Sequence, residues 1–499
     1  ENYQSIRDEL EAAGHDFRSE TDTEVIPHLI EDAMADGATF PGAFRRVIAR
    51  LEGSYAVAAV TAGEDVVLAA RRGSPLVLGV GDDAYYLGSD VPAFLAETNR
   101  VVYVEDGEIA RLDPDGWSVT DGDGEPVAHE VRTVDWDPEE TGKGGYDHYM
   151  LKEIHEQPRS LRQCIQGRVD ELAGSIEVEE LSDVGPVDAV HLVACGTSYH
   201  AALYAAQLFR DAGVPAQAFL ASEYATSPPP IPVGTLVVGI TQSGETADTL
   251  SALREAKGRS APTLAVTNVV GSTAARECDH AVYIRAGPEI GVAATKTFSS
   301  QVTAASLLVR AIAGRDHSDR RTGEYVAALR DLPGQVQAVL DGTNAREVAE
   351  AFVGADAYFF IGRGLNYPVA LEGALKMKEI TYRHAEGFAA GELKHGPLAL
   401  VGEDTPVFAT VTGSDQLARK TIGNVKEVET RGAPVVVVTD GATEVERYAD
   451  VTLSVPRTDP RLVPVLANVQ YQLVAYHTAA LLDRSIDKPR HLAKSVTVE

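Results

Sequence analysis

The sequence predicts an α/β protein in which two tandem, doubly wound parallel-sheet domains follow a smaller α+β domain. From about residue 180, short apolar runs alternate with helical patterns, which is typical of a parallel sheet. That alternating region also repeats itself along the chain. Before it, residues 1 to about 130 carry short apolar runs separated by glycine and acidic turns, which is typical of antiparallel strands.

The first region is expected to form a meander-like sheet with helices packed on it. A helical pattern begins at Val25, and a second one precedes Glu52. Residues 112 to 145 are acidic and rich in turns, and their later part is interpreted as a linker. A helix from about Tyr149 to Arg168 is expected after it. Strands are expected at 54–60, 65–70, 76–79, 84–87 and 101–104.

The internal repeat defines the two parallel-sheet domains. The stretch 193–199 recurs as 361–367, an offset of 367 − 199 = 168, and 261–268 recurs as 433–440, an offset of 433 − 261 = 172. Such similar offsets indicate one duplicated domain. The predicted boundaries are 1–135 for the N-terminal domain, 136–178 for a linker and helix, 179–320 and 346–486 for the two copies, and 487–499 for a tail.

Composition and charge restrict the partners of this chain. Its 499 residues are 44% hydrophobic and include 44 basic and 74 acidic side chains, so the net charge is 44 − 74 = −30. This charge disfavours nucleic acid and anionic membranes as partners. Its spread along the whole chain resembles proteins of salt-loving cells. No run approaches the roughly 18 to 20 apolar residues of a membrane span, so no membrane association is expected.

The cysteines indicate a reduced, cytoplasmic setting. Cys164, Cys195 and Cys278 show no metal-binding spacing and cannot all pair with one another. The first residues are polar, so no signal peptide is expected. Neither a metal nor a cofactor is expected from the sequence.

The segment 371–379 carries the residue types needed for proton transfer. In a helix, Glu372, Lys376, Glu379 and Arg383 share one face, because they are spaced by four, three and four residues. An acid and an amine with a nearby imidazole can move protons on a sugar. An exposed ladder of ion pairs, each worth about 0.2–0.5 kcal/mol, would produce the same pattern. The helix alone does not separate these two interpretations.

Two polar turns in the first copy are predicted to bind an anion. The strand 236–240 leads directly into Thr241-Gln242-Ser243-Gly244-Glu245-Thr246, and an earlier strand leads into Gly196-Thr197-Ser198. Both turns lie at the carboxyl ends of strands in one sheet, where N–H groups, hydroxyls and a helix dipole favour phosphate. Helix capping is the alternative, but it explains one hydroxyl rather than several. The second copy has Thr412-Gly413-Ser414-Asp415 there, so its phosphate function is expected to be lost.

Three other features are interpreted as structural from the residues alone. Lys296, near a predicted helix start, is expected to be a surface or hinge residue. His395 follows the 371–379 helix by a short distance and could turn back over its end. The tail from Asp487 to Glu499 has no helical period and is interpreted as a frayed terminus.

Three motifs in the same order make the chain resemble a known family. They are 241–246, the helix 371–379 with its partner 391–397, and the closing tail. Together they closely resemble the family of glutamine–fructose-6-phosphate aminotransferases (isomerizing), also called glucosamine-6-phosphate synthases. The resemblance implies a pair of sugar isomerase (SIS) domains, and Ser19–Val25 looks like the family's N-terminal-nucleophile-type glutaminase domain. The implied reaction converts fructose 6-phosphate to glucosamine 6-phosphate by amide transfer from glutamine and ketose–aldose isomerisation, the first step of hexosamine synthesis.

The resemblance also implies a role for each matching residue. Lys494 would form a Schiff base with the open-chain ketose, and Glu379 would move a proton between C1 and C2. His395 would open the sugar ring from the neighbouring subunit, which implies a homodimer. Lys376 would be a further catalytic residue on the charged face. The implied substrate-binding residues are Thr197, Ser198, Thr241, Gln242, Ser243, Thr246, Glu289, Val292 and Glu372.

One departure from the family concerns the glutaminase part. The family uses an N-terminal cysteine to release ammonia from glutamine, and this sequence has no cysteine before Cys164. Of the matching glutamine-site residues, only Asp22 is present. We therefore expect a truncated glutaminase domain with an exposed sheet edge. This polypeptide is expected to use free ammonia, or only to isomerise the sugar.

Two alternatives stay open at this point. A sugar-phosphate-binding regulator built on tandem SIS domains would need the phosphate turns, but not Glu379, His395 and Lys494 together. A deglycase or aldose–ketose isomerase would use the same domains without amide transfer. The stretch around Asp22 argues against that second alternative.

Overall fold

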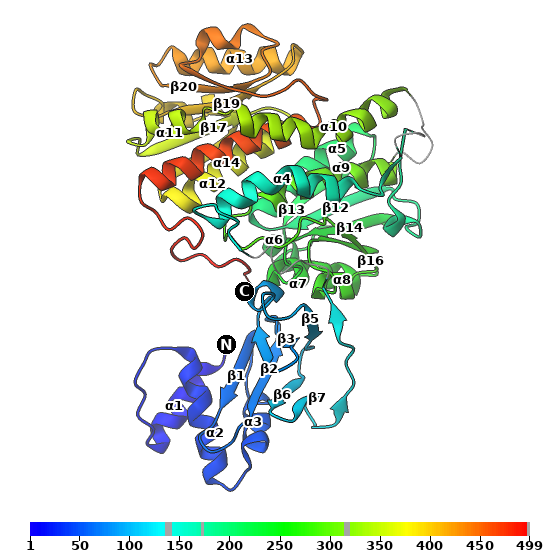
Figure 1. The fold of residues 1–499 in the computed structure, drawn as a ribbon, viewed down its shortest axis with the longest axis vertical. Helices are drawn as coiled ribbons and strands as arrows, with labels where there is room; N and C mark the ends of the chain where they lie inside the picture. Colours follow the sequence, from blue (N-terminus) through cyan, green and yellow to red (C-terminus); the bar gives the residue numbers. More distant parts are fainter. Residues whose placement is uncertain (135–141, 171–173, 314–319, 497–499) are drawn as a thin grey trace. The chain divides into compact units, whose positions relative to one another are not determined.

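The computed structural model describes residues 1–134, 142–170, 174–313 and 320–496. It contains two compact units, drawn as ribbons in Figure 1. One comprises residues 1–142 with 245–247 and 495–499, and the other comprises 143–244 and 248–494. Parts of the predicted linker, first copy and tail fall on 135–141, 171–173, 314–319 and 497–499, which lie outside the described residues.

The first unit combines three helices with two antiparallel sheets. The helices are α1 (Tyr3–Ala13), α2 (Val25–Ala35) and α3 (Phe40–Ile48). The sheets have the strand orders β1-β2-β6-β7-β8 and β4-β3-β5-β9. The five predicted strands and both predicted helices are confirmed. The strands are β1 (Tyr55–Val60), β2 (Val67–Arg72), β3 (Val77–Val80), β4 (Tyr85–Gly88), β5 (Arg100–Tyr103), β6 (Ile109–Asp113), β7 (Gly116–Thr120), β8 (Pro126–Val127) and β9 (Arg132–Thr133).

The acidic region 112–145 holds strands that the turn-rich sequence concealed. Strands β6 and β7 form a hairpin in which Asp113 pairs with Gly116. The Asp113 carboxylate accepts the N–H groups of Asp115 and Gly116, each at 3.1 Å, so an acidic residue stabilises the tight turn. Aspartate and glycine therefore mark the turn of a hairpin here rather than the absence of strands.

Strand β1 lies at the edge of its sheet among the described residues. Its side chains alternate between partly covered and exposed, and Val60 is 71% exposed. A cavity of about 790 Å³ lies beside it, lined by β1 and by Ile26, Ile30 and Met34 of α2. An apolar helix face and the outer edge of β1, which pairs only with β2 in this sheet, therefore meet at an open surface.

The second unit confirms the predicted duplication. Its two main sheets are entirely parallel and have the orders β13-β12-β14-β15-β16 and β18-β17-β19-β20-β21, so the same topology occurs twice. This order is one of the two common doubly wound arrangements. The strands are β12 (Ala189–Ala194), β13 (Ala216–Leu220), β14 (Thr235–Ile240), β15 (Thr263–Thr267), β16 (His280–Tyr283), β17 (Ala357–Gly362), β18 (His384–Ala389), β19 (Val407–Val411), β20 (Val435–Thr439) and β21 (Val451–Ser454).

Helices between the two sheets join both copies into one core, as Figure 1 shows for α4, α12 and α14. Helix α5, in the first copy, packs on both α9 and α12. The first copy therefore contacts α12, the charged helix of the second copy. The predicted helix at Tyr149 is confirmed as α4. The helices are α4 (Tyr149–Ile165), α5 (Gly196–Asp211), α6 (Ala221–Thr226), α7 (Ala247–Gly258), α8 (Thr273–Glu277), α9 (Lys296–Ala313), α10 (Arg320–Gly342), α11 (Ala345–Phe352), α12 (Asn366–Thr381), α13 (Gln416–Glu429) and α14 (Val463–Leu481).

Gly373 shows how closely α12 is held in this core. A Cβ atom at this position would lie 2.9 Å from the ring of Phe360 and 2.8 Å from that of Tyr471. Glycine therefore lets α12 approach β17 and α14 more closely than any larger residue could. Within the described ranges, no helix is long and apolar enough to span a bilayer.

Candidate active site

Helix α12 presents Glu372, Lys376 and Glu379 on one face, as their spacing predicts. Lys376 Nζ lies 3.4 Å from Glu372 Oε1 and 2.6 Å from Glu379 Oε2. The side chains of Glu372 and Lys376 are fully buried, and that of Glu379 is 20% exposed. The interpretation as an exposed ion-pair ladder is therefore wrong. Buried charges of this kind carry a large desolvation cost, which is typical of functional sites.

Arg383 was expected on the same face, and this expectation is wrong. Helix α12 ends at Thr381, and Tyr382 takes a left-handed conformation with φ 61°. The chain therefore turns away before Arg383, which pairs with Asp356 at 2.8 Å. Helical spacing holds only as far as the helix extends.

Glu372 connects the charged helix to the start of α5 in the first copy. Thr197 Oγ1 donates to Glu372 Oε1 at 3.0 Å, and His200 Nδ1 lies 2.7 Å from Glu372 Oε2. Lys376 Nζ also donates to Thr197 Oγ1 at 3.1 Å. The sequence reasoning missed His200, because its partner lies 172 residues away and no local pattern points to it.

The surroundings of Lys376 and Glu379 shift the pKa values of both side chains, with different consequences for their charge. Burial by itself would lower the pKa of Lys376, but the carboxylates of Glu372 and Glu379 raise it above its ordinary value. Lys376 is therefore a fixed cation. Burial raises the pKa of Glu379, partly offset by Lys376, so this carboxyl moves toward the range useful for proton transfer.

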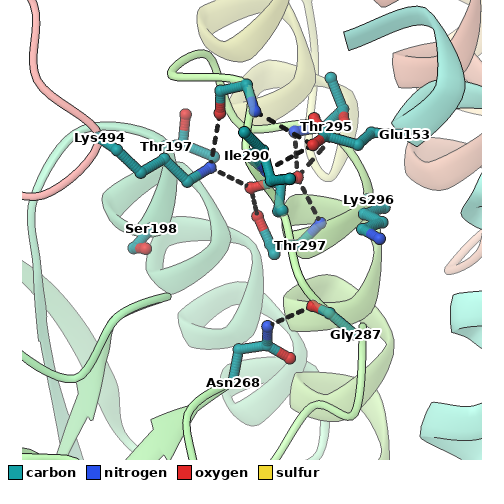
Figure 2. Close-up of polar contacts among 12 residues, drawn as sticks. Glu153, Thr197, Ser198, Asn268, Gly287, Ile290, Thr295, Lys296, Thr297 and Lys494 are labelled. Carbon is teal, nitrogen blue, oxygen red and sulfur yellow. Dashed lines mark hydrogen bonds and ion pairs between the residues drawn. The ribbon is translucent and has the colours of Figure 1, made fainter. Parts of the chain in front are cut away.

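Lys494 lies in a second cluster, centred on the carboxylate of Glu289. Lys494 Nζ donates to Glu289 Oε2 at 2.6 Å and to the carbonyl of Gly291 at 2.8 Å. Figure 2 shows Lys494 and Thr297 directed at the same point, where Thr297 Oγ1 donates to Glu289 Oε2 at 2.7 Å. Thr295 N donates to Glu289 Oε1 at 2.8 Å. Within this part of the chain, the interpretation of the tail as frayed is wrong.

Glu289 is held as an anion opposite Lys494. Burial alone would raise its pKa, but Lys494 and the hydrogen bonds from Thr295 and Thr297 lower it to about 2. The positive charge of Lys494 also lowers the pKa of Glu379 on α12. The two clusters therefore lie within electrostatic reach of each other.

The tail reaches this site because Asp487 docks it onto α4. The carboxylate of Asp487 accepts the N–H groups of Tyr149 and Met150, each at 3.0 Å, at the positive end of the helix dipole. Its backbone carbonyl accepts Val292 N at 3.0 Å. The predicted residue Val292 thus fixes the tail through its backbone.

Two residues that the sequence reasoning missed hold the loop that carries Glu289. Asn268 donates from Nδ2 to the Gly287 carbonyl at 2.7 Å and accepts Ala286 N at 2.9 Å (Figure 2). Glu153 of α4 accepts Ile290 N at 2.5 Å and Gly291 N at 3.1 Å. Helix α4 therefore holds the Glu289 loop through hydrogen bonds to its backbone. The sequence had predicted α4 only as a connecting helix.

The buried carboxyl of Glu153 has an unusually high pKa. Burial and the negative charge of Glu289 raise its pKa to about 7, against the opposing charges of Lys494 and Lys296. Within the described residues, Glu153 Oε2 has no hydrogen-bond partner. When Glu153 is protonated next to the ionised Glu289, two negative charges do not have to lie close together in a buried site.

Replacing Glu153 by glutamine should stabilise the protein most above pH 7. An ordinary glutamate ionises near pH 4.5, whereas folded Glu153 holds its proton to about pH 7, so wild-type stability falls as pH rises between these values. Glutamine cannot ionise and avoids this loss. The difference in thermal unfolding midpoint should grow with pH in favour of Glu153→Gln. The exposed Glu179→Gln is the control, and a pH-independent difference would contradict the assignment.

Lys296 was expected at the surface, and this expectation is wrong. Its side chain is 3% exposed, and its Nζ pairs with Glu156 Oε2 of α4 at 2.6 Å. Lys296 opens α9 beside the Glu289 loop and points away from Lys494 in Figure 2. It therefore ties α9 to α4.

The predicted phosphate turns lie at the carboxyl ends of neighbouring strands. Strand β12 pairs with β14, and each leads directly into its polar turn. Thr197 and Ser198 lie in the first turn of α5, where Ser198 Oγ accepts Gln301 Nε2 at 2.9 Å. In the β14 turn, Thr241 and Ser243 are buried, and Gln242 accepts Asn268 N through its backbone carbonyl at 3.1 Å. Thr246 is half-buried just before α7 and groups with the first unit.

Two predicted residues stand apart from these clusters. His395 is exposed at the end of a short 3₁₀ turn, Glu392–Lys394, and its backbone N–H bonds to Glu392 O at 2.8 Å. Among the described residues, no hydrogen bond or ion pair joins the His395 side chain to Lys494 or to Glu372, Lys376 and Glu379 of α12. Asp22 opens the 3₁₀ turn Asp22–Glu24 in the first unit, where it is exposed.

The fold and the clustered residues define a protein of SIS architecture with a glutamine amidotransferase region. The family described as "SIS domain" matches residues 187–311 and 352–482, and the family described as "Glutamine amidotransferase domain" matches residues 1–96. The chain belongs to the family of glutamine–fructose-6-phosphate aminotransferases (isomerizing), and is thus an aminotransferase.

The chain is similar to the following three proteins. The glutamine–fructose-6-phosphate aminotransferase (isomerizing) of Halobacterium salinarum is 53% identical over 508 residues, covering 100% of this chain and 83% of that protein. The C-terminal domain of glucosamine–fructose-6-phosphate aminotransferase from Francisella tularensis has a TM-score of 0.65 and 36% identity, covering 70% of this chain and 100% of that one. Glucosamine-6-phosphate deaminase from Thermotoga maritima has a TM-score of 0.56 and 27% identity, covering 70% and 99%.

Proposed function

We propose that this chain makes glucosamine 6-phosphate from fructose 6-phosphate and ammonia. The observation that carries the proposal is the placement of the Lys494 amine within electrostatic reach of Glu379, the carboxylate that pairs with Lys376. A regulator that only binds sugar phosphate gains nothing from a tail lysine anchored next to a proton-transfer residue. Membership of the aminotransferase family supports the same substrates.

The proposed chemistry begins with an imine. Lys494 Nζ, once deprotonated, attacks C2 of the open-chain ketose, and water leaves as the C=N bond forms. Ammonia then replaces the lysine at C2. Glu379 takes a proton from C1 and delivers it to C2, while the O1 hydroxyl loses a proton and the imine nitrogen gains one, which together convert the ketose imine to the amino aldose. Lys376 stays charged and stabilises the negative charge that develops on oxygen or on the Glu379 carboxylate.

The two polar turns are proposed to hold the phosphate group. The N–H groups at the start of α5 and the hydroxyls of Thr197, Ser198, Thr241 and Ser243 are of the type that binds phosphate at a helix N-terminus. Gln242 is proposed to bind in the same region. Because β12 and β14 are neighbours, both turns can contact one anion.

The source of ammonia and the oligomeric state are further parts of the proposal. Added ammonia serves as the nitrogen donor in the proposed reaction of these 499 residues, in which Cys164 is the first cysteine. His395 is exposed and separate from Lys494, which supports a homodimer in which each subunit supplies this histidine to its partner's site.

Reductive trapping tests the proposal. Fructose 6-phosphate and borohydride should link the sugar irreversibly to Lys494, identified by peptide mass spectrometry, and ammonia should support formation of glucosamine 6-phosphate. Fructose lacking the phosphate is the control and should label poorly. Tight binding without any trapped adduct would instead support the sugar-phosphate-binding regulator.

A further inference from the structure

Two histidines of the first unit face each other across a short distance. His15 follows α1, and His28 lies in α2. Their Nδ1 atoms are 3.0 Å apart. Glu31, one turn beyond His28 on α2, places Oε2 3.9 Å from His28 Nδ1. One ligand atom from each of the three residues lies within 4.8 Å of the others.

A carboxylate also lies near the Nε2 atom of each imidazole. His15 Nε2 lies 2.8 Å from Asp32 Oδ1, and His28 Nε2 lies 3.8 Å from Glu24 Oε1. The hydrogen bond to Asp32 places a ring proton on His15 Nε2, so Nδ1 of a neutral His15 directs a lone pair at His28 Nδ1.

Two imidazole nitrogens 3.0 Å apart need either a proton shared between them or a cation bound to both. The rings are not free to turn away, because the His28 ring packs 4.6 Å from the ring of Phe17, and the Arg7 guanidinium covers Phe17 at 4.4 Å. The side chains of His15 and His28 are only 15% and 18% exposed. Glu31 is 74% exposed and can rotate toward the two nitrogens.

We propose that His15, His28 and Glu31 form a binding site for a divalent transition-metal cation of the Zn²⁺ type. Two imidazole nitrogens and one carboxylate, with a water in the fourth position, suit this class, whereas Mg²⁺ and Ca²⁺ prefer oxygen ligands. Ligand atoms of a tetrahedral zinc lie about 3.3 Å apart, from bond lengths of about 2.0–2.1 Å. The distances of 3.0 and 3.9 Å bracket that value. Asp32, whose Oδ1 lies 2.8 Å from His15 Nε2, supplies an outer hydrogen bond of the kind that orients metal-bound histidines.

The site would fix the segment that contains Asp22. His15 and His28 lie on either side of residues 16–27, so a shared cation closes this segment into a loop. The sequence reasoning found no metal spacing, because the two histidines are 13 residues apart on different elements.

Metal titration of the full chain tests this site. After chelator treatment and buffer exchange, Zn²⁺ binding is measured by calorimetry in high salt, which weakens adventitious binding to the acidic surface. Co²⁺ absorption then reports nitrogen ligation. One equivalent should bind, and His15→Gln or His28→Gln should lower the affinity at least about a hundredfold, while Asp32→Asn should lower it about 10–100-fold.

His129→Gln is the matched control. His129 Nε2 also lies beside a carboxylate, 2.9 Å from Glu108 Oε2. Among the described residues, however, His129 does not belong to the group of candidate ligands His15, His28 and Glu31. Its loss should leave Zn²⁺ binding unchanged. Zn²⁺ should also raise the thermal unfolding midpoint of the wild type and of His129→Gln, but not of His28→Gln, with metal-free midpoints showing that each variant folds. Absence of stoichiometric binding, or equal binding by all variants, would overturn the proposal.

Discussion

Replacing Lys494 by arginine should abolish both imine trapping and amination, with a loss of at least about 10³-fold in turnover, or roughly 4 kcal/mol of transition-state stabilisation. Arginine can keep the ion pair with Glu289, which lies 2.6 Å from Lys494 Nζ. It cannot act as the amine nucleophile, because its guanidinium stays protonated. The variant therefore separates the chemical role of Lys494 from its structural role. Turnover is measured as glucosamine 6-phosphate formed from fructose 6-phosphate and ammonia.

Lys488→Arg provides the matched control for Lys494→Arg. Lys488 is exposed in the same tail, so this variant should keep wild-type turnover. Mixing Lys494→Arg with His395→Ala subunits extends the test to the proposed dimer. If His395 serves the partner's site, mixed dimers recover one intact site, whereas each variant alone stays inactive. An active Lys494→Arg enzyme would refute the imine mechanism.

Replacing Glu379 by glutamine should lower turnover by about 10²–10⁴-fold while imine trapping persists. Glutamine keeps the size of the side chain but cannot accept a proton from C1. Exchange of the C1 hydrogen with deuterated solvent should disappear with turnover. Because burial raises the pKa of Glu379, the wild-type rate should fall as pH falls through a value above the ordinary glutamate range. That acidic limb should be absent from the residual activity of Glu379→Gln.

Glu386→Gln is the control for the Glu379 variant. Glu386 lies on β18 with a side chain that is 48% exposed, and no part of the proposed site includes it. Its replacement should change neither turnover nor deuterium exchange. Loss of trapping together with turnover in Glu379→Gln would contradict a role confined to proton transfer, because imine formation requires only Lys494.

Local sequence patterns predicted much of the fold for a physical reason. The alternation in β1 expresses the period of a strand, the apolar runs of β14 and β20 indicate strands buried on both faces, and the spacing of Glu372, Lys376 and Glu379 expresses the period of a helix. These periods depend only on neighbours along the chain. The same dependence explains the error at Arg383, since the pattern did not show that the helix stops at Thr381.

Resemblance to the family pointed to Lys494 and Glu289, but residue physics alone misjudged the tail and Lys296. A short polar tail and a lone lysine look solvated in sequence, because burial depends on segments that pack from far along the chain. Lys494 meets Glu289 across 205 residues, and Lys296 meets Glu156 across 140. No window of local sequence contains both members of either pair.

The sequence by itself determined the class of fold, the duplication, the acid–amine face of α12 and the family. Only the tertiary structure decided which charges are buried, that His200 joins Glu372, that neutral Glu153 supports the Glu289 loop, and that His15 faces His28. The physical reason is that pairing and desolvation are set by three-dimensional neighbours. A periodic pattern fixes which side of an element a residue occupies, but packing decides whether that side meets water, another charge or a partner residue.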